Sequence, residues 1–413
     1  MVKIYHIDDE AERYIPITLD ELVPGTQISF EIFCHDGTMI KSLLDKGATY
    51  SLFAQKMIEK QAVGRFFIRQ GSALNLNEYM HNAAKLKRML LDPHFFESRY
   101  REFRDKWFVV DKQVLNSGIP FDIRLGGLRF PVFGEIPFSV DNNATYRHLL
   151  DLNSDIAVRK QDVDAYYTYL DTILDAEWIE DPLLKLRARR EKLNVWCYRV
   201  LEEASGDGIR QDTLLKLYKH ISIVLKLLIN DFSYAGNFLF FDVSDVFLPL
   251  HSVNVCLLSM IVGHMMNREE SALFNLGIAA VLHDVGRVAI NDEGGEDAPS
   301  GAARELFKSH VVKGHEILAP CSDVPRAAKV VALTHHEHVD GSGYVYGLTG
   351  ERIHPFSKIV GVVDTFENRL VTDFRHASLK RAEIIEMMAR NGGRFDPDVL
   401  AAFIRFMAGV ALL

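Results

Sequence analysis

The sequence predicts an α+β protein with two parts: a small region of mixed α/β character over residues 1–182 and an all-helical bundle over residues 183–413. Two observations lead to this division. Alternating apolar and polar residues, the pattern of strands, are confined to the first part, for example at 26–33 and 64–69. After Asp181-Pro182, apolar residues recur at helical spacing, first over 183–205 and 212–229.

The first part is expected to alternate between short strands and helices. Strand-like stretches at 26–33, 64–69 and 121–140 accompany helical patterns at 51–61, 74–116 and 159–174. The order of strands, helix and short strand occurs twice, around 26–69 and 121–179, which suggests a duplicated module. Because no cluster of His, Cys or carboxylate side chains occurs before residue 182, we expect this region to regulate or dimerise the protein.

Composition narrows the class of protein. With 48% hydrophobic and 25% charged residues the chain is typical of a globular protein, and its net charge of −9 argues against a partner that is a nucleic acid polymer. The four cysteines are widely spaced, as in reduced cytosolic proteins. The longest apolar stretch, 253–266, is interrupted by polar residues and too short for a bilayer, so a cytoplasmic protein without a membrane partner is expected.

The helical part concentrates residues that bind metals. Ten of the sixteen histidines lie at or after position 251. Apolar helical runs at 272–282, 328–333 and 359–363 precede His283-Asp284, His335-His336 and Asp364, respectively. Imidazole and carboxylate ligands suit Mn, Fe, Co or Zn, and inward-facing ligands on helices are typical of metal sites in helical bundles. The candidate ligands in chain order are His251, His283, Asp284, His310, His335, His336 and Asp364.

Two motifs carry a resemblance to a known family. His283-Asp-Val-Gly-Arg287 and His335-His-Glu-His-Val-Asp-Gly-Ser-Gly-Tyr-Val-Tyr-Gly-Leu348 resemble the signatures of the HD-GYP phosphodiesterases, metal-dependent phosphohydrolases of the HD superfamily. Phe395-Asp-Pro397 matches the family's C-terminal motif, so the resemblance covers about 251–400. It implies an all-α HD-type bundle that hydrolyses cyclic di-GMP to linear pGpG and onward to GMP.

The resemblance also implies roles for the ligand candidates. Asp284 would bridge two divalent transition-metal ions, with iron or manganese favoured, and these ions would activate water and neutralise phosphate charge. Glu337 is expected to orient a ligand histidine. The two expected ligand sets that share Asp284 are His251, His283 and Asp364 for one ion, and His310, His335 and His336 for the other.

The residues expected to contact the cyclic dinucleotide match the family pattern less closely than the metal ligands do. Arg287 replaces a family lysine and is expected to act in catalysis and substrate binding, since arginine keeps the charge and adds bidentate phosphate geometry. The resemblance places Tyr344, Gly341 and Gly343 in a loop over the site. Either Arg375 or Arg369 is expected to hold a phosphate or a guanine, and the sequence does not choose between them.

Three departures from the family pattern keep alternatives open. Val345 stands where the family has proline, and Phe247 stands where some members place a glutamate, which predicts two ions instead of three. The family's arginine-rich segment is represented only by Asp373-Phe-Arg-His376. The alternatives are a cyclic-dinucleotide receptor without turnover, and an HD-superfamily phosphohydrolase acting on cyclic GMP-AMP or another nucleotide.

Overall fold

The computed structural model describes residues 4–5, 14–17, 22, 26–35, 40–46, 49–50, 66–76, 79–81, 106–115, 123–126, 155–177, 179–239, 247–290, 301–370 and 381–410. These residues divide into two compact units, one formed by 1–109 with 117–160 and the other by 110–116 with 161–413. The division differs from the boundary expected near residue 182 by one helix, α5 (Val163–Asp175). A regulatory role for the first unit and a duplication within it stay predictions.

The first unit contains a five-stranded antiparallel sheet with strand order β1-β5-β4-β7-β2. Ile28, Phe30, Ile32 and Ile68 are at most 1% exposed and form its core. The single strand expected over 26–33 is two strands, because the chain bends at Ser29–Phe30. The strands of this sheet and of the short β3–β6 pair are β1 (Ile4–Tyr5), β2 (Tyr14–Ile17), β3 (Thr26–Gln27), β4 (Ile32–His35), β5 (Ile40–Leu44), β6 (Thr49–Tyr50) and β7 (Phe66–Arg69).

A second, three-stranded sheet has the order β8-β10-β9, with β8 (Trp107–Val110), β9 (Ile123–Gly126) and β10 (Asp155–Arg159). β9 and β10 are antiparallel, with Ile123 opposite Val158. The prediction of helix through 74–116 is wrong for β8. Its sequence Trp-Phe-Val-Val is buried throughout, and aromatic and β-branched residues favour strands.

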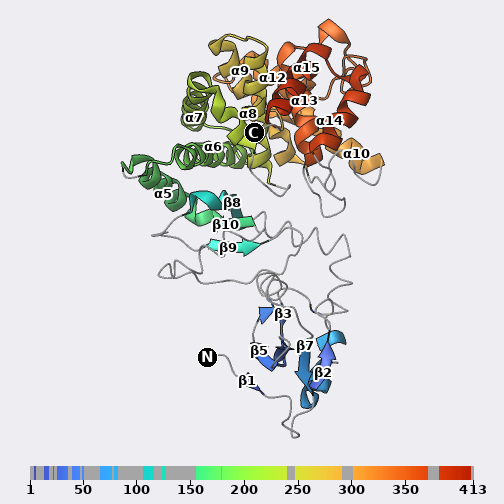
Figure 1. The fold of residues 1–413 in the computed structure, drawn as a ribbon. Coiled ribbons are helices and arrows are strands. Elements are labelled where there is room, and N and C mark those ends of the chain that lie inside the picture. The colour runs from blue at the N-terminus through green and yellow to red at the C-terminus, as the bar shows by residue number, and fades with distance from the viewer. Residues whose placement is uncertain are drawn as a thin grey trace. The chain divides into compact units, whose positions relative to one another are not determined.

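The second unit is a bundle of helices around one hydrophobic core (Figure 1). The all-helical architecture expected for the C-terminal half is confirmed, and the α+β class of the whole chain with it. Its helices after α5 are α6 (Pro182–Ala204), α7 (Gln211–Asn230), α8 (Leu248–Met265), α9 (Glu270–Val281), α10 (Gly301–Lys308), α11 (His310–Leu318), α12 (Arg326–Thr334), α13 (Pro355–Leu370), α14 (Arg381–Arg390) and α15 (Pro397–Val410).

Local chemistry explains where α6 begins. The carboxylate of Asp181 accepts hydrogen bonds from the backbone N–H groups of Leu183 and Leu184, and Pro182 occupies the first turn. A carboxylate cap satisfies N–H groups that have no partner within the helix, and proline tolerates this position because its missing N–H is not needed there. The change of character at Asp181-Pro182 is therefore a helix start inside the second unit.

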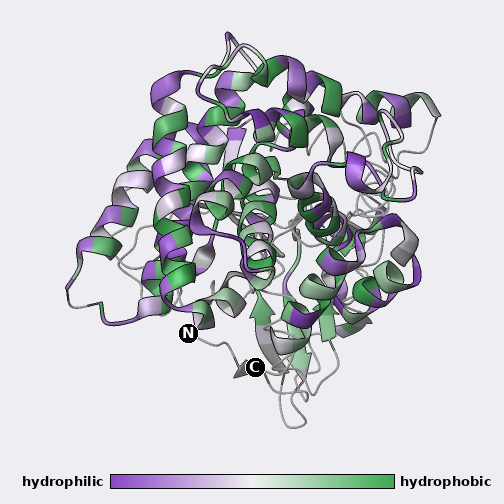
Figure 2. Ribbon diagram, turned by 90° about the horizontal axis from the view of Figure 1, so that it is seen from above, coloured by the Kyte–Doolittle hydropathy of each residue, from purple (hydrophilic) through white to green (hydrophobic). Residues whose placement is uncertain are grey.

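Helix α8 lies in the core of the bundle and carries the first candidate ligand. It is apolar on nearly all sides and packs against α6, α9, α13 and α15. Helices around it alternate hydrophobic and hydrophilic residues, as amphipathic outer helices do (Figure 2). Leu248–Met265 and Glu270–Ala289 are long and apolar enough to cross a membrane, but 78% and 67% of these stretches are buried within the bundle. Core packing therefore accounts for their composition.

Candidate metal centre

The ends of several helices bring the seven predicted ligands together in the helical unit. His251 lies in the first turns of α8, and His283 and Asp284 occupy the turn between α9 and the 3-10 helix η6 (Val285–Ala289). His310 begins α11, and α13 carries Asp364. His335 and His336 directly follow α12. Each of the seven residues is at most 7% exposed, so the cluster is an internal polar site in an apolar bundle.

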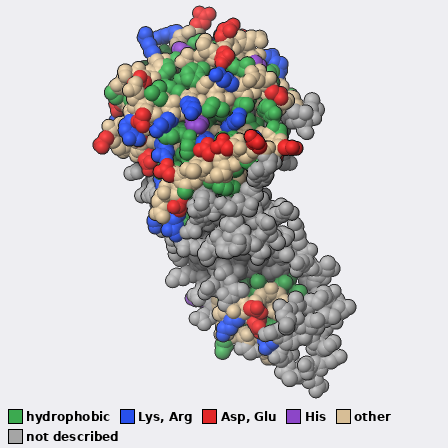
Figure 3. Space-filling model, turned by 90° about the vertical axis from the view of Figure 1, so that its left-hand side faces the viewer, with side chains coloured by type: hydrophobic (Ala, Val, Ile, Leu, Met, Phe, Trp, Pro, Cys, Tyr) green, Lys and Arg blue, Asp and Glu red, His purple; other side chains and the backbone are tan. Residues whose placement is uncertain are grey.

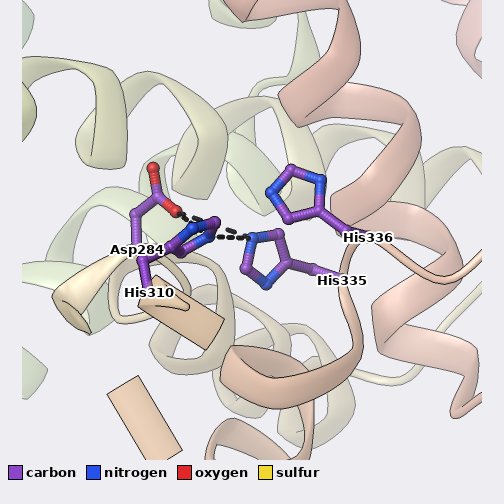
Figure 4. A group of neighbouring side chains, drawn as sticks. All are labelled: Asp284, His310, His335 and His336. Atoms are coloured by element: carbon purple, nitrogen blue, oxygen red, sulfur yellow. Dashed lines mark hydrogen bonds and ion pairs between the residues drawn. The ribbon is translucent and has the colours of Figure 1, made fainter. Parts of the chain in front are cut away.

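The two carboxylate oxygens of Asp284 face different histidines. Oδ1 lies 3.1 Å from Nε2 of His310 and 3.5 Å from Nε2 of His335 (Figure 4). Oδ2 lies 3.6 Å from Nε2 of both His251 and His283. Ligand atoms within 4.8 Å of one another form two groups that share this aspartate: His251, His283, Asp284 and Asp364, and Asp284, His310, His335 and His336.

In three of the histidines the proton lies on Nδ1, which leaves the lone pair of Nε2 available to bind a cation. Nδ1 of His283 lies 2.7 Å from the carbonyl oxygen of Ala280, and Nδ1 of His310 lies 2.6 Å from that of Phe307. Nδ1 of His335 makes the same kind of bond to a carbonyl one turn earlier. Since a carbonyl oxygen only accepts, each Nδ1 carries the proton and donates it. Such a bond fixes the ring orientation, as it does for histidines that ligate metals.

Several buried atoms of the cluster have no hydrogen-bond partner. These are Nε2 of His251, Nε2 of His283 and Oδ1 of Asp284. A buried polar atom without a partner costs free energy, and such atoms on both sides of Asp284 would be unfavourable without bound groups. Imidazole nitrogens and carboxylate oxygens are ligands for divalent transition metals. The donor set therefore fits two cations, one in each group.

The pKa values of the aspartates favour their charged forms. Burial raises the pKa of Asp284, but the neighbouring His283 and Arg287 outweigh it and hold this pKa well below its usual range. For Asp364, burial also raises the pKa, but the neighbouring rings of His251 and His283 outweigh it and lower this pKa well below normal. Both carboxylates are therefore negative, as cation ligands must be.

The histidines of the cluster differ in pKa. Burial and the neighbouring His336 lower the pKa of His335 to about 3, so this ring is neutral and its lone pair is available. Burial also lowers the pKa of His283, but Asp284 and Asp364 outweigh it and raise the value above normal. In the metal-free cluster, His283 is therefore the ring on which a proton competes with a cation.

Gly286 allows η6 to approach α11 closely enough to place His310. A Cβ atom at Gly286 would lie 1.9 Å from the carbonyl oxygen of His310 and 2.3 Å from the backbone nitrogen of Gly314. The sequence pattern indicated Gly286 as a helix-ending glycine, but the close approach of two backbones is what excludes a side chain. His310 and Gly314 lie one helical turn apart on α11, so both face η6.

Tyr344 covers one face of the cluster. Its ring stacks on that of His336, with centroids 4.7 Å apart and planes 21° apart. The loop that carries it needs glycine at two points: Gly341 has φ of +82°, and a Cβ at Gly343 would lie 2.4 Å from the backbone nitrogen of His338. These predicted loop residues are thus brought to the ligands, and both glycines shape the backbone.

Glu337 has a different role from the one expected. Its two carboxylate oxygens accept hydrogen bonds from the backbone N–H groups of Tyr346 (2.7 Å) and Leu348 (2.8 Å). The prediction that this residue orients a ligand histidine is wrong. Because the loop turns back over its own start, the buried Glu337 carboxylate satisfies two N–H groups of the returning segment and fixes the loop over the cluster.

Two cationic side chains lie at the edge of the cluster. Nη1 of Arg287 lies 3.1 Å from Oδ2 of Asp284, and its guanidinium is 5.7 Å from the ring centroid of Phe307. The ammonium of Lys308 lies 5.6 Å from the ring centroid of Tyr344. The sequence singled out Arg287 but missed Lys308, whose one signal is its place two residues before His310.

The structure describes some of the remaining residues that the sequence singled out, but not all of them. Arg369 lines a pocket beside His335 and His336, together with Lys358 and Arg394. Arg375 and the segment around it lie outside the described residues. Phe247 is buried at the start of α8, and its carbonyl accepts the N–H of His251. Among the residues that the structure describes, candidate metal ligands form only the two groups above.

Comparison with known proteins agrees with this architecture. Residues 248–399 match the family model of the HD domain. A solved HDG"Y"P protein from Bdellovibrio bacteriovorus has a TM-score of 0.56, with 14% sequence identity, covering 73% of this chain and 99% of that one. At this level of identity the similarity shows a shared fold.

Sequence relatives each match part of this chain. A cyclic di-GMP phosphodiesterase of Pseudomonas aeruginosa is 31% identical over 169 residues, 39% of this chain and 40% of that protein. A 3'3'-cGAMP-specific phosphodiesterase of Vibrio cholerae is 34% identical over 158 residues, 36% of this chain and 30% of that protein. The chain thus spans less than half the length of these relatives. Residues 248–399 therefore match the HD domain, and parts of the chain are similar in sequence to cyclic dinucleotide phosphodiesterases.

Proposed function

We propose that this protein is a metal-dependent phosphodiesterase that hydrolyses cyclic di-GMP to linear pGpG and onward to GMP. The observation that carries the proposal is the position of Asp284, whose two oxygens face two separate sets of histidines within one buried cluster. A shared carboxylate is the feature that a pair of cations requires, and paired cations are a common solution for phosphodiester hydrolysis.

The seven proposed metal ligands would form two sets, the same two groups that the distances define. His251, His283 and Asp364 would hold one ion, His310, His335 and His336 the other, and Asp284 both. Ions bound there would supply activated water and positive charge for the phosphate. A set rich in imidazole with two carboxylates and no thiolate suits iron or manganese.

The chain's own side chains would bind and orient the dinucleotide. Arg287 and Lys308, at the edge of the cluster, are placed to attract phosphate oxygens, and arginine can do so through two parallel hydrogen bonds. The ring of Tyr344 offers a surface beside His336 for a base or ribose. Arg369 lines the neighbouring pocket and is our candidate for a second phosphate or a guanine, with Arg375 as the alternative.

The rest of the chain would serve regulation. We propose that the first unit senses a signal or joins two copies of the chain, and that the protein acts in the cytoplasm. On the face drawn in Figure 3, basic and acidic side chains of the helical unit are interspersed. This supports a small anionic ligand bound at a defined site more than a nucleic acid polymer, which needs a broad basic surface.

A second candidate substrate has its own support. Cyclic GMP-AMP is the substrate named for a relative from Vibrio cholerae that is as similar in sequence as the cyclic di-GMP phosphodiesterases. Both ligands present the same diester linkages, so the metal cluster does not discriminate between them. The choice would rest on contacts to the bases.

One assay separates these possibilities. Purified protein would be stripped of metal, reloaded with Mn²⁺ or Fe²⁺, and incubated separately with cyclic di-GMP and 3'3'-cGAMP, with Asp284→Asn as the inactive control. Conversion of cyclic di-GMP to pGpG that depends on added metal is the expected result. Faster turnover of 3'3'-cGAMP would favour the second substrate. Tight binding without any product would instead indicate a receptor and overturn the proposed activity.

A further inference from the structure

Arg190 on α6 is completely buried, although its guanidinium does not belong to the histidine cluster. Its Nη2 donates to Oδ1 of Asn254 at 2.6 Å, and its Nη1 donates to Oε1 of Glu191 at 3.2 Å. A buried charge costs several kcal/mol unless hydrogen bonds and an opposite charge compensate for it. The bond from Arg190 therefore helps to fix the side-chain amide of Asn254.

Asn254 links the two helices that carry His251 and Asp364. It lies three residues after His251 on α8, and Glu367 lies three residues after Asp364 on α13, so each shares a helix face with a ligand. The amide Nδ2 of Asn254 donates to the carboxylate of Glu367. One turn beyond the ligands, α8 and α13 are thus joined by a buried hydrogen bond.

The ligands themselves interact with this link. Nδ2 of Asn368, next to Glu367, donates to Oδ1 of Asp364 at 2.8 Å. Asn254 and Glu367 each lie one helical turn from a ligand, His251 and Asp364 respectively. Loss of the bond between them would consequently be felt at both ligands.

The series of hydrogen bonds that begins at Glu367 ends in a short segment of the sequence, residues 110–116. Glu191 accepts from the hydroxyl of Tyr166 at 2.9 Å and from the backbone nitrogen of Asp111 at 3.2 Å. Asp111 also pairs with Arg187 at 2.8 Å. Segment 110–116 belongs to the helical unit, whereas the chain on both sides of it belongs to the first unit.

We propose that Arg190, Asn254 and Glu367 are positioning residues for the half of the metal site formed by His251 and Asp364, and that Asp111 connects this half to segment 110–116. The inference rests on the proposed function only in assuming that the cluster binds metal. It predicts that the two ions are not equivalent, since α8 and α13 carry ligands of one group while α11 carries His310 of the other.

Metal titration of Asn254→Leu tests the proposal directly. Leucine keeps the size of asparagine but removes both hydrogen bonds. The metal-free variant would be titrated with Mn²⁺, with bound metal measured by calorimetry and the coupling of two Mn²⁺ ions by electron paramagnetic resonance. Loss of partners that orient ligands typically weakens metal binding about 10-fold or more. We expect this loss for one ion only, leaving a mononuclear Mn²⁺ signal.

A matched control removes a different buried polar bond from the same bundle. Thr213 on α7 is 0% exposed and donates to Glu203, so Thr213→Val should lower stability without changing either ion. Two equally bound ions in Asn254→Leu, or equal loss of both, would overturn the proposal. If Asn254→Leu does not fold, Glu367→Met, which cannot accept the bond from Asn254, decides in the same way, with selective weakening of one ion expected and unchanged binding of both contradicting it.

The link to segment 110–116 has its own test. Asp111→Asn keeps the size of the side chain and the backbone bond to Glu191 but removes the charge that pairs with Arg187. It should weaken the same ion as Asn254→Leu by a smaller factor, and unchanged titration would overturn the connection. Wild-type protein that binds two ions but hydrolyses no cyclic dinucleotide overturns the proposed function alone. Wild-type protein that binds no metal overturns both.

Discussion

Arg287 forms an ion pair with Asp284, the carboxylate that both groups of histidines share: Nη1 lies 3.1 Å from Oδ2. The aspartate side chain is 3% exposed and the arginine side chain 25% exposed, so the guanidinium extends from the buried cluster toward its edge. It helps to keep Asp284 ionised. The arginine is thus tied to the cluster and still partly exposed to solvent, as the phosphate contact that we propose for it requires.

Replacing Arg287 with alanine should impair hydrolysis while leaving the metals bound. Losing a charge-assisted hydrogen bond should reduce transition-state stabilisation by about 2 kcal/mol, which lowers kcat/KM roughly 30-fold. Arg287→Lys should lose less, since the charge remains. Kinetics and elemental analysis of the same samples measure both effects, with the exposed Arg390→Ala as a control. Unchanged kinetics in Arg287→Ala would show that this arginine does not contact the substrate.

The two aspartates of the cluster should differ in their effect on metal content. Asp284 faces both groups, so Asp284→Asn should release both ions, whereas Asp364→Asn should release only the ion of the His251 group. Asparagine keeps the size of the side chain and removes the charge. Elemental analysis after dialysis gives the number of ions per chain. An Asp284→Asn variant that retains one ion would contradict the shared position of this carboxylate.

The stack of Tyr344 on His336 can be separated from the tyrosine hydroxyl. Tyr344→Phe keeps the ring that lies 4.7 Å from His336, so metal content should be unchanged. Tyr344→Ala also removes the ring surface proposed to contact a base or ribose. An aromatic contact of that kind is worth about 1 kcal/mol, so KM should rise about fivefold. Steady-state kinetics of the two variants give the comparison. Equal effects of the two substitutions would assign the role to the hydroxyl instead.

Glu337 offers a direct test of loop positioning against ligand orientation. In Glu337→Gln one oxygen becomes an NH₂ group, which cannot accept from the backbone N–H of Tyr346 or Leu348. Leaving one buried donor without a partner should cost about 1–3 kcal/mol of stability and raise KM, with metal content unchanged. Chemical unfolding and elemental analysis measure these quantities. A variant that loses metal would restore the original expectation for this residue.

The ligand set was predictable because its signals are local. Each of His283, His335 and Asp364 follows or continues an apolar helical run, a position where an isolated polar side chain would be unfavourable. The helices themselves follow from the periodicity of their apolar residues, and α6, α7 and α9 lie close to the predicted ranges. The grouping into two sets around Asp284 came from family resemblance, and the distances agree with it.

The features that the sequence did not predict depend on contacts between distant residues. Glu337 bonds to N–H groups 9 and 11 residues later, which requires the path of the loop to be known. The bond from Arg190 to Asn254 joins residues 64 apart. In the sequence, Arg190 lies in the basic run 185–192, and such a run by itself predicts a solvated helix face. Burial reverses that interpretation, because the helix that carries the run packs inside the bundle.

The last prediction concerns stability and pH. His220 on α7 lies 3.1 Å from the hydroxyl of Tyr167, and burial together with Lys192 and Lys219 lowers its pKa to about 4. An unfolded histidine binds its proton near pH 6.5. Between these values the unfolded state binds more protons, so the free energy of unfolding must fall as the pH falls from about 6.5 to about 4. Glu191, whose pKa burial raises to about 7, acts in the opposite direction.

Comparing wild type with His220→Gln isolates the histidine, because the contribution of Glu191 cancels in the difference. Glutamine can still bond to the Tyr167 hydroxyl but does not titrate. Urea unfolding in the presence of a chelator, at pH 7, 5.5 and 4.5, should show the wild type losing more stability than the variant, by up to roughly 2–3 kcal/mol at the lowest pH. Parallel pH profiles would mean that His220 accepts a proton in the folded protein as easily as in the unfolded chain, and that Lys192 and Lys219 lie too far from its ring to repel it.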